Sequence, residues 1–578
     1  FEMLNASERN GYVGTAQANY KFTDELNLMV RTTVDMMYES RSQQRPMGTQ
    51  KYNEGMYREQ DIYAHEINSD FLLSYNNKRA RDFDFSISVG GSLMNNTYRR
   101  DEYRAERLLF PGIYNFANSK DLLIPLPFRR NYAVNSLYAL STFSYKNVLF
   151  LDVTGRQDWA STLASPINGN VSPFFYPSAN LSAIISDVVS LPRQFDYLKL
   201  RSSYASVGGG GTTAYLTDYA YSPLATFPGG LTNPSSIPDP NLNFERTRSF
   251  ELGMDLKMFK NRFGLDLTVY RSNSFDQILS TPIDPASGYT SKIVNAGNVQ
   301  NQGIEIESYI IPIQNKNGLN WRIFGNFTHN DSKVISLADG MENMVLGTVF
   351  GSRGTVEARP GGRYGDIYGL GYERTPNGDI LYEGGYPVLG DSILYLGNAT
   401  ALYRFGLGHE FKYKNFRFSF LFDGQFGGRA YSLTHSVLME EGKLKKTLPG
   451  RYNGIIGNGS IANGDGTYRP NDVVATSIRD YYFRHFNRDN LESNIFSTDY
   501  IKLREMRFDY KIPAKYLQRI LLQNATIGVY GRDLFVFSKW PSFDPEFGTL
   551  GNGDISKSAE IAQFPSTRTI GFNISLGI

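Results

Sequence analysis

Cysteine is absent from this chain of 578 residues, which excludes disulfide bonds, thiolate nucleophiles and cysteine-ligated metal sites. Long apolar runs are also missing, and without a run of about 18 apolar residues there is no candidate transmembrane helix. Neither sign of charge dominates, because 59 Lys and Arg nearly balance 57 Asp and Glu. With a net charge of +2 and no basic run, nothing indicates nucleic-acid binding.

Enzymatic motifs are missing as well. The five histidines are far apart without a His-x-x-x-His pair, and Gly208–Gly211 is not followed by the Gly-Lys-Ser/Thr of a phosphate loop. Glu305 and Glu307 would share one strand face, where such pairs are usually wall charges rather than an acid and a nucleophile. Asn463–Asp472 has oxygen ligands spaced somewhat like a calcium loop but lacks its bidentate Glu. We therefore expect no enzymatic activity, and calcium in this loop is the one cofactor left open.

Apolar and polar residues alternate along many segments. In Asn415–Gln425, one face would carry Phe416, Phe418, Phe420 and Phe422, and the other Arg417, Ser419, Asp423 and Gln425. About seventeen segments show this period of two, which indicates strands with one apolar and one polar face. Aromatic residues make up 14% of the chain, and this abundance suits belts at two membrane interfaces.

The connections between these segments are alternately short and long. The short ones include KFTDEL at Lys21–Leu26, Lys146–Asn147, Lys260–Arg262 and Lys414–Asn415. The long ones include Glu39–His65, Asn95–Arg130, Gly208–Asn243, Phe275–Val299, Asp331–Asn398, Gly427–Ser497 and Lys539–Phe564. A soluble β-sandwich would share the period of two, but the alternation of connections is typical of a transmembrane barrel with short periplasmic turns and long extracellular loops. We therefore predict an all-β fold, an up-and-down antiparallel transmembrane β-barrel.

From Asp239 onward the chain resembles the SusC/RagA-like TonB-dependent outer-membrane transporters of Bacteroidetes. Two motifs, PNL-x-x-E and N-x-G-x-V-x-N-x-G-x-E, are formed here by Pro240, Asn241, Leu242, Glu245, Asn295, Gly297, Val299, Asn301, Gly303 and Glu305. Three further similar blocks are Leu421–Tyr431, Ser497–Pro513 and Gly528–Phe547, the last containing Asp544 and Pro545. The departures are Ala399, where the family often has Pro, and Ile578, where many outer-membrane proteins end in an aromatic residue.

The resemblance implies a barrel of roughly 22 strands closed by a plug, of which residues 1–578 would form the receptor-like barrel portion with about 17 strands. By counting back from the last strand, we expect the first one, at Tyr12–Phe22, to run toward the periplasm. Further barrel strands should then precede it. We also expect the signal peptide, the carboxypeptidase-regulatory-like domain, the TonB box and the plug to lie outside this chain.

The resemblance further implies a multi-pass protein of the bacterial outer membrane, surrounded by lipid and lipopolysaccharide, that imports an oligosaccharide or, in some members, a peptide. TonB–ExbB–ExbD would supply the energy through the part of the protein outside this chain. A SusD-like surface lipoprotein would cap the long loops. The alternative is a SusC-like barrel that acts as a structural or scaffold subunit of an outer-membrane assembly, and a TonB box with an intact plug would favour import over that role.

Strand direction and parity place several side chains near the extracellular mouth. We expect substrate contacts from Arg156, Asp158, Trp159, Asp423, Gln425 and Arg532. Planar polar groups beside an indole, such as that of Trp159 or Trp540, offer the hydrogen bonds and the stacking face that sugar binding uses. The alternative is that the charged residues pair with the plug and that the tryptophans belong to the aromatic girdle.

Overall fold

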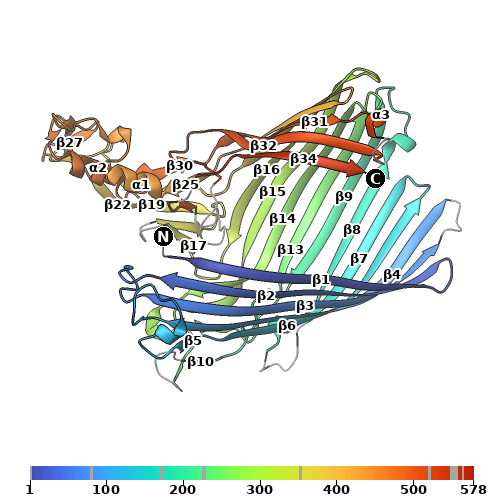
Figure 1. The fold of residues 1–578 in the computed structure, drawn as a ribbon, viewed down its shortest axis with the longest axis horizontal. Coiled ribbons are helices and arrows are strands. Elements are labelled where there is room, and N and C mark those ends of the chain that lie inside the picture. The colour runs from blue at the N-terminus through green and yellow to red at the C-terminus, as the bar shows by residue number, and fades with distance from the viewer. Residues whose placement is uncertain are drawn as a thin grey trace. The chain divides into compact units, whose positions relative to one another are not determined.

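The computed structural model describes residues 3–77, 82–165, 167, 171, 173–223, 230–349, 354–517, 522–546, 558–562 and 565–577. Its largest sheet contains 19 strands (Figure 1). Two of them, β5 (Ile124–Pro125) and β12 (Ser236–Ile237), have two residues each, which leaves 17 long strands. The predicted all-β fold and the predicted number of strands are therefore confirmed, while Ile578 lies outside the described residues.

The chain divides into two compact units. The first contains a run of neighbouring antiparallel strands, β1 (Asn5–Lys21), β2 (Leu26–Arg45), β3 (Met56–Asn77), β4 (Phe83–Ala105), β6 (Phe128–Tyr145), β7 (Leu149–Ala160) and, except for its last residue, β8 (Phe174–Ile184). Four more strands have residues in both units, namely β9 (Phe195–Gly209), β13 (Glu245–Met258), β14 (Phe263–Pro282) and β15 (Ser291–Gln314). The two-residue strands β10 (Ser222–Pro223) and β11 (Leu231–Thr232) pair with each other.

The second unit contains the remaining long strands, β16 (Leu319–Ser336), β23 (Tyr403–Tyr413), β24 (Phe416–Phe426), β31 (Tyr500–Lys511), β32 (Asn524–Ser538) and β34 (Thr569–Gly577). Each pairs antiparallel with the next in this order. The short helix α3 (Ala514–Leu517) lies in the connection between β31 and β32. A consecutive antiparallel meander is the arrangement that the alternating connections predicted.

The shortest turns contain residues whose backbone is left-handed. Lys146 and Asn147 have φ values of 53° and 56°, and Lys260 and Asn261 have 58° and 59°. Two consecutive residues with positive φ make a turn whose twist matches that of the flanking strands, and asparagine tolerates this backbone better than most residues. The Lys-Asn and Lys-Asn-Arg turns read from the sequence are therefore the tight hairpin ends of the sheet.

Several strands extend beyond the limits that the sequence pattern suggested. The predicted connection Glu39–His65 is mostly strand, because β2 continues to Arg45 and β3 begins at Met56. Strand β4 likewise continues into Asn95–Arg130, and β14 and β15 take up most of Phe275–Val299. These extensions carry polar residues on both faces, so they lack the period of two by which a half-apolar strand is recognised. Parts of Gly208–Asn243 and Lys539–Phe564 lie outside the described residues.

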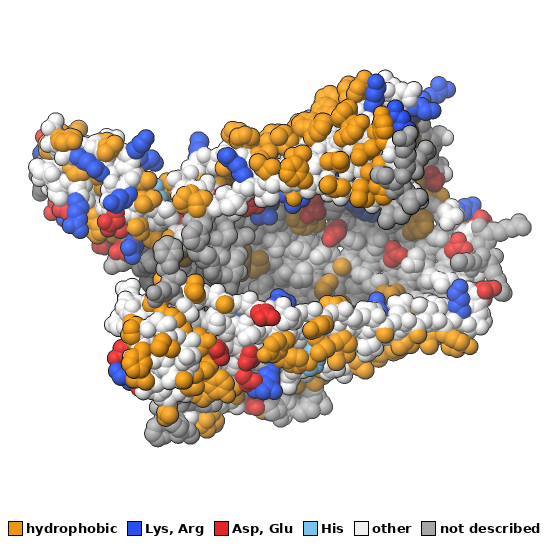
Figure 2. Space-filling view, viewed as in Figure 1, with side chains coloured by type: hydrophobic (Ala, Val, Ile, Leu, Met, Phe, Trp, Pro, Cys, Tyr) orange, Lys and Arg blue, Asp and Glu red, His pale blue; other side chains and the backbone are white. Residues whose placement is uncertain are grey.

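The two faces of β24 separate as predicted. On one face the ring of Phe416 contacts that of Tyr510 in a tilted arrangement with centroids 4.8 Å apart, and the ring of Phe418 lies 6.3 Å from that of Phe411. On the other face Arg417 forms an ion pair of 2.6 Å with Glu410. Figure 2 shows hydrophobic side chains gathered over β31, β32 and β34, where exposed apolar residues include Phe508, Phe535, Phe537, Ile570, Phe572 and Ile574. None of the described helices is long and apolar enough to cross a membrane.

Replacing Phe418 with Arg should destabilise the protein by about 2–4 kcal/mol when it folds into lipid vesicles, if this face contacts the bilayer near its midplane. The reason is that the guanidinium would have to leave water for hydrocarbon. Ser419→Arg is the matched control, since Ser419 lies on the opposite face of β24 and its substitution should change the free energy of unfolding much less. Equal effects of the two substitutions would contradict the assignment of faces.

Candidate functional site

Asp423 and Gln425 lie on the polar face of β24, opposite the part of β31 where the pairing register shifts. Leu421 pairs with Glu505 and Phe422 with Leu503, so Arg504 is an extra residue in its strand. The pairing between β31 and β32 shifts at the same place, and Asp533 there has a φ of 51°. Such β-bulges redirect side chains, and this one directs Arg504 toward the polar face.

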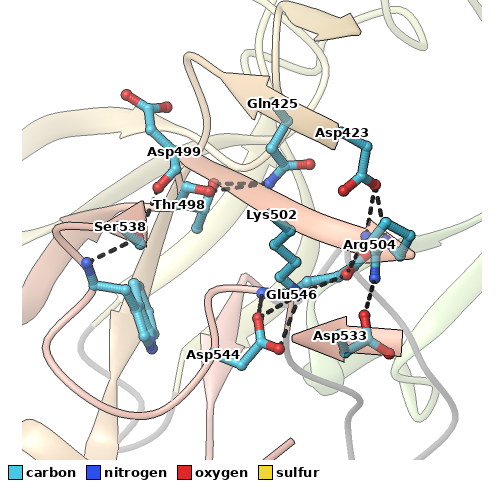
Figure 3. Close-up of polar contacts among 11 residues, drawn as sticks. Asp423, Gln425, Thr498, Asp499, Lys502, Arg504, Asp533, Ser538, Asp544 and Glu546 are labelled. Atoms are coloured by element: carbon cyan, nitrogen blue, oxygen red, sulfur yellow. Dashed lines mark hydrogen bonds and ion pairs between the residues drawn. The ribbon is translucent and has the colours of Figure 1, made fainter. Parts of the chain in front are cut away.

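Arg504 is the centre of an ion-pair network on this face (Figure 3). Its guanidinium lies 2.6 Å from Asp423, 2.9 Å from Asp533 and 2.7 Å from Glu546. The Nζ of Lys502 contacts Asp544 at 2.8 Å and shares Glu546 at 2.7 Å. The network therefore joins three strands to the connection between β32 and β34.

Burial makes this network energetically important. The Lys502 side chain is only 3% exposed, and an ammonium group in such a place is stable only with close carboxylate partners. Burial by itself would raise the pKa of Asp544, but the hydrogen bonds from Lys502, the Glu546 backbone and Ser566, together with the Lys502 charge, lower the pKa overall. Asp544 and Glu546 thus remain charged, and four carboxylates surround two cations.

The same region fixes the position of Trp540. Ser538 donates a hydrogen bond of 2.6 Å to the Asp499 carbonyl and accepts one of 3.1 Å from the Trp540 backbone. The buried indole lies edge-on to Phe496, 6.1 Å away, and Phe496 in turn lies 4.7 Å from the ring of His435. Trp540 is therefore a packing residue in this structure, with little surface left for stacking a sugar. Gln425 donates to the Thr498 carbonyl at 3.2 Å.

The remaining predicted contacts occupy other places. Arg156 forms an ion pair of 2.7 Å with Asp158, which also accepts a hydrogen bond of 2.6 Å from Tyr176. Trp159 follows Asp158 directly on β7, so it lies on the opposite face, where it lines an apolar depression with Leu93 and Leu137. Arg532 is exposed and pairs with Glu505 at 2.9 Å.

The structure brings together Asp423 and Gln425 with residues that sequence reasoning had not singled out. Those missed residues are Lys502, Arg504, Asp533 and Glu546. One signal was present, because Lys502 and Arg504 alternate with the apolar Ile501 and Leu503. The two consecutive polar residues Arg504 and Glu505 break the alternation and also mark the bulge, whereas the left-handed backbone of Asp533 has no signature in the sequence.

The residues of the family motifs have mainly structural contacts. Asn295 accepts a hydrogen bond from the Asn243 backbone at 2.6 Å and donates to the carbonyls of Asn243 and Asp276, both at 2.8 Å. A Cβ atom on Gly303 would come within 2.2 Å of the His329 carbonyl oxygen, so only glycine fits.

Other motif residues lie nearby or in the network. Gly297 has a φ of 85°, and the Asn241 backbone donates to Asp239 at 2.9 Å. Asn301 is half-buried and Glu305 exposed on β15, while Pro545 lies between the two carboxylates that bind Lys502.

Three long connections of the second unit fold together into what we call the cap, which comprises the described residues 344–349, 354–398, 427–497 and 558–560. One hydrophobic cluster joins them, and it contains Val349, Val356, Ile367, Tyr431, Leu433, Leu491, Ile495 and Ala559. A second cluster contains Tyr382, Met439, Ile461, Ala475, Tyr481 and Tyr482. The cap is thus an ordered domain with a core of its own.

The cap has a sheet, two helices and several short strands. The sheet comprises β17 (Met344–Val349), β18 (Gly354–Ala358), β19 (Asp366–Tyr372) and β22 (Leu389–Asn398). The helices are α1 (Leu433–Glu440) and α2 (Ile478–Phe486). The short strands are β20 (Tyr382–Glu383), β21 (Tyr386–Pro387), β25 (Arg429–Ser432), β26 (Ile455–Ile456), β27 (Ser460–Ala462), β28 (Tyr468–Pro470), β29 (Val474–Ala475), β30 (Ile495–Ser497) and β33 (Ala559–Glu560).

Two buried histidines lie in the cap. The ring nitrogens of His485 lie 2.9 Å from the Tyr372 hydroxyl and 3.1 Å from the Tyr382 hydroxyl. Burial lowers the pKa of His485 to about 4. Burial also lowers the pKa of His435, whose Nδ1 lies 3.0 Å from the Asn494 side-chain oxygen. Both imidazoles are therefore neutral at pH 7.

The loop considered for calcium, Asn463–Asp472, begins directly after β27 and contains the turn of the β27–β28 hairpin and strand β28. Asp465 accepts hydrogen bonds from the Thr467 backbone at 2.9 Å and hydroxyl at 2.6 Å, and Asp472 pairs with Arg469. Among the described residues, no group of three acidic, His or Cys side chains could hold a metal ion. Calcium at this loop stays a prediction.

The strand order and the separation of apolar and polar faces define a class, the outer-membrane β-barrel receptors. A family described as "TonB dependent receptor-like, beta-barrel" matches residues 3–379, and the chain belongs to that family. It is accordingly a multi-pass outer-membrane protein whose apolar face contacts lipid. The resemblance to SusC/RagA-like transporters is confirmed.

Individual proteins of known name are also similar to this chain. TonB-dependent receptor P3 of Formosa agariphila is 23% identical over 479 residues, covering 76% of this chain and 45% of the relative. TonB-dependent receptor P39 of the same organism is 25% identical over 475 residues, covering 73% and 44%. The chain thus spans less than half the length of these relatives. The solved RagAB peptide transporter has the same fold, with a TM-score of 0.76 at 17% identity, over 99% of this chain and 62% of that one.

Lys502→Met should release residues 539–546 from strand β31, because Asp544 would keep a buried charge without its cation. Removing one partner of a buried pair costs about 3–5 kcal/mol, and hydrogen exchange of this segment should rise accordingly. Arg532→Gln is the control, since the exposed Arg532–Glu505 pair is worth only about 0–1 kcal/mol. Unchanged exchange in Lys502→Met would show that the network does not hold this segment.

The buried His485 makes the stability of the cap depend on pH. Its pKa is about 4 in the folded protein against 6.5 ordinarily, so the unfolded cap binds the proton more tightly. The stability that the cap gains from burying a neutral His485 is complete above pH 6.5 and is lost as the pH falls from 6.5 toward 4. Hydrogen exchange around Tyr372 and Tyr382 should accelerate over this range. His485→Gln should flatten the profile, and an equally steep profile would assign the effect to other groups.

Proposed function

We propose that this chain forms the barrel of a TonB-dependent importer of an oligosaccharide or a peptide, and that its cap holds a SusD-like lipoprotein. The observation that carries the proposal is the cap itself. Connections of this length are uncommon without a function, and these have two hydrophobic cores rather than the composition of disordered tails. An ordered extracellular domain on a transport barrel suits partner and cargo binding.

The surface of the cap supports a protein partner. Tyr452 is almost completely exposed, and Ile456, Val474 and Phe483 are also solvent-exposed apolar residues of the same domain. Ile456 and Val474 are adjacent because β26 pairs with β29. Exposed apolar groups of this kind are typical of interaction surfaces, and a lid over a wide barrel mouth would bury more than the roughly 1,600 Å² of a standard interface.

The ion-pair network supports a mechanical role for the large sheet, which would hold the connection after β32 in place. Asp544 and Glu546 hold the connection after β32 against β31, and Trp540 of that connection packs on Phe496 beside the cap helix α1. Force for import would come from TonB–ExbB–ExbD through parts of the protein outside this chain. Asp423, Gln425, Arg156 and Asp158 are the polar-face residues that we propose as cargo contacts at the mouth.

Co-purification and uptake test this function together. In mild detergent a lipoprotein should co-purify with the wild-type protein, and the double substitution Tyr452→Glu/Ile456→Glu should weaken that association and slow cargo uptake by cells. Deleting Gly427–Ser497 should abolish both, and loss of TonB should abolish uptake alone. Lys445→Glu, a change at an already charged position of the cap, serves as the control. A barrel that purifies alone and supports uptake without TonB would contradict the importer and favour a scaffold.

A further inference from the structure

The strand β22 lies at the edge of the four-stranded sheet of the cap. The sheet order is β17–β18–β19–β22, so among the described residues β22 has a strand partner on one side only. Two of its large side chains, Ile393 and Tyr395, are each 57% exposed. An exposed edge with apolar side chains presents unpaired backbone N–H and C=O groups, and natural proteins usually protect such edges unless another chain pairs there.

A groove of about 730 Å³ runs along this edge. Five consecutive residues of β22, Leu394–Asn398, line it together with three arginines, Arg363, Arg374 and Arg429. The absence of a side chain at Gly397 leaves room for the Arg429 side chain, because a Cβ atom at position 397 would come within 2.3 Å of the Arg429 Cδ. The groove thus combines a strand edge with a set of guanidinium groups.

The three guanidinium groups are not fully neutralised. Arg374 pairs with Glu492, which also lines the groove. Arg363 lies 3.0 Å from Asp331, but its buried Nη2 has no hydrogen-bond partner among the described residues. Arg429 is exposed, and the described part of the chain supplies no ion pair for it. Free guanidinium N–H groups bind carboxylates in a bidentate manner, so the exposed guanidinium of Arg429 makes the groove suited to an oxyanion.

We propose that this groove binds an extended acidic peptide, which pairs with the free edge of β22 and places a carboxylate on Arg429 and Arg363. The inference rests on the proposed import function and names the cargo class within it. A strand edge recognises a peptide by main-chain hydrogen bonds, with alternate side chains entering flanking pockets. An anionic oligosaccharide could satisfy the arginines, but it has no regular row of amides to pair with β22.

Fluorescence polarisation with the purified full-length protein in detergent tests the inference. The probes are a labelled hexapeptide alternating Val and Glu, the same peptide with N-methylated valines, and hexagalacturonate as a competitor. The first peptide should bind, and N-methylation should weaken it about tenfold because it removes the main-chain donors. Arg429→Gln should also weaken binding about tenfold. Arg469→Gln, which alters a guanidinium of the β28 hairpin outside the groove, should leave binding unchanged.

Three results would overturn the inference. The first is binding of the N-methylated peptide as tight as that of the parent, which would reduce the groove to a simple anion site. The second is displacement of the peptide by hexagalacturonate at lower concentrations than by unlabelled peptide, which would assign the groove to a glycan. The third is wild-type affinity in Arg429→Gln. Since this assay requires neither TonB nor a lipoprotein, its failure leaves the importer intact, whereas loss of TonB-dependent uptake in cells is the failure of the proposed function.

Discussion

The structure depends on one constraint, that a backbone crossing lipid must pair all its N–H and C=O groups within the protein. Strands can do this only beside other strands, and the long strands of the described residues accordingly belong to one large sheet. The constraint also sets the chemistry of the side chains. One face of each strand can be apolar, as Phe416 and Phe418 are, while Arg417 between them pairs with Glu410 on the other face.

The sequence was most informative where this constraint acts. Inside the membrane each strand has an apolar and a polar face, so the faces of β24 and the Lys-Asn turns could be predicted from residue order alone. Outside the membrane the constraint is relaxed. The outer ends of β2 and β3 are polar on both faces and are stabilised by pairs such as Arg58–Glu102, at 2.8 Å, which no periodicity reveals.

The site was predicted only in part, for a related reason. Asp423 and Gln425 followed from strand parity, but the partners that give Asp423 its role depend on a bulge at Arg504 and on a connection that returns to the wall at Asp544. The cap was even harder to predict from the sequence. Its cores unite residues more than a hundred positions apart, such as Val349 and Leu491, and only the folded chain shows that three polar, glycine-rich segments form one domain.

The bulge in β31 has a consequence for how the protein enters the membrane. Strands β31 and β32 form a hairpin whose open end carries Arg504, Glu505, Arg532 and Asp533, and this end has to pass through the bilayer to reach the outside. Within the hairpin Arg504 already pairs with Asp533 and Arg532 with Glu505. Two acids and two bases therefore travel as neutral cross-strand pairs, which lowers the cost of moving them through hydrocarbon. Lys502 lacks a carboxylate within the hairpin, so its charge is compensated only when residues 544–546 arrive beside it on the far side.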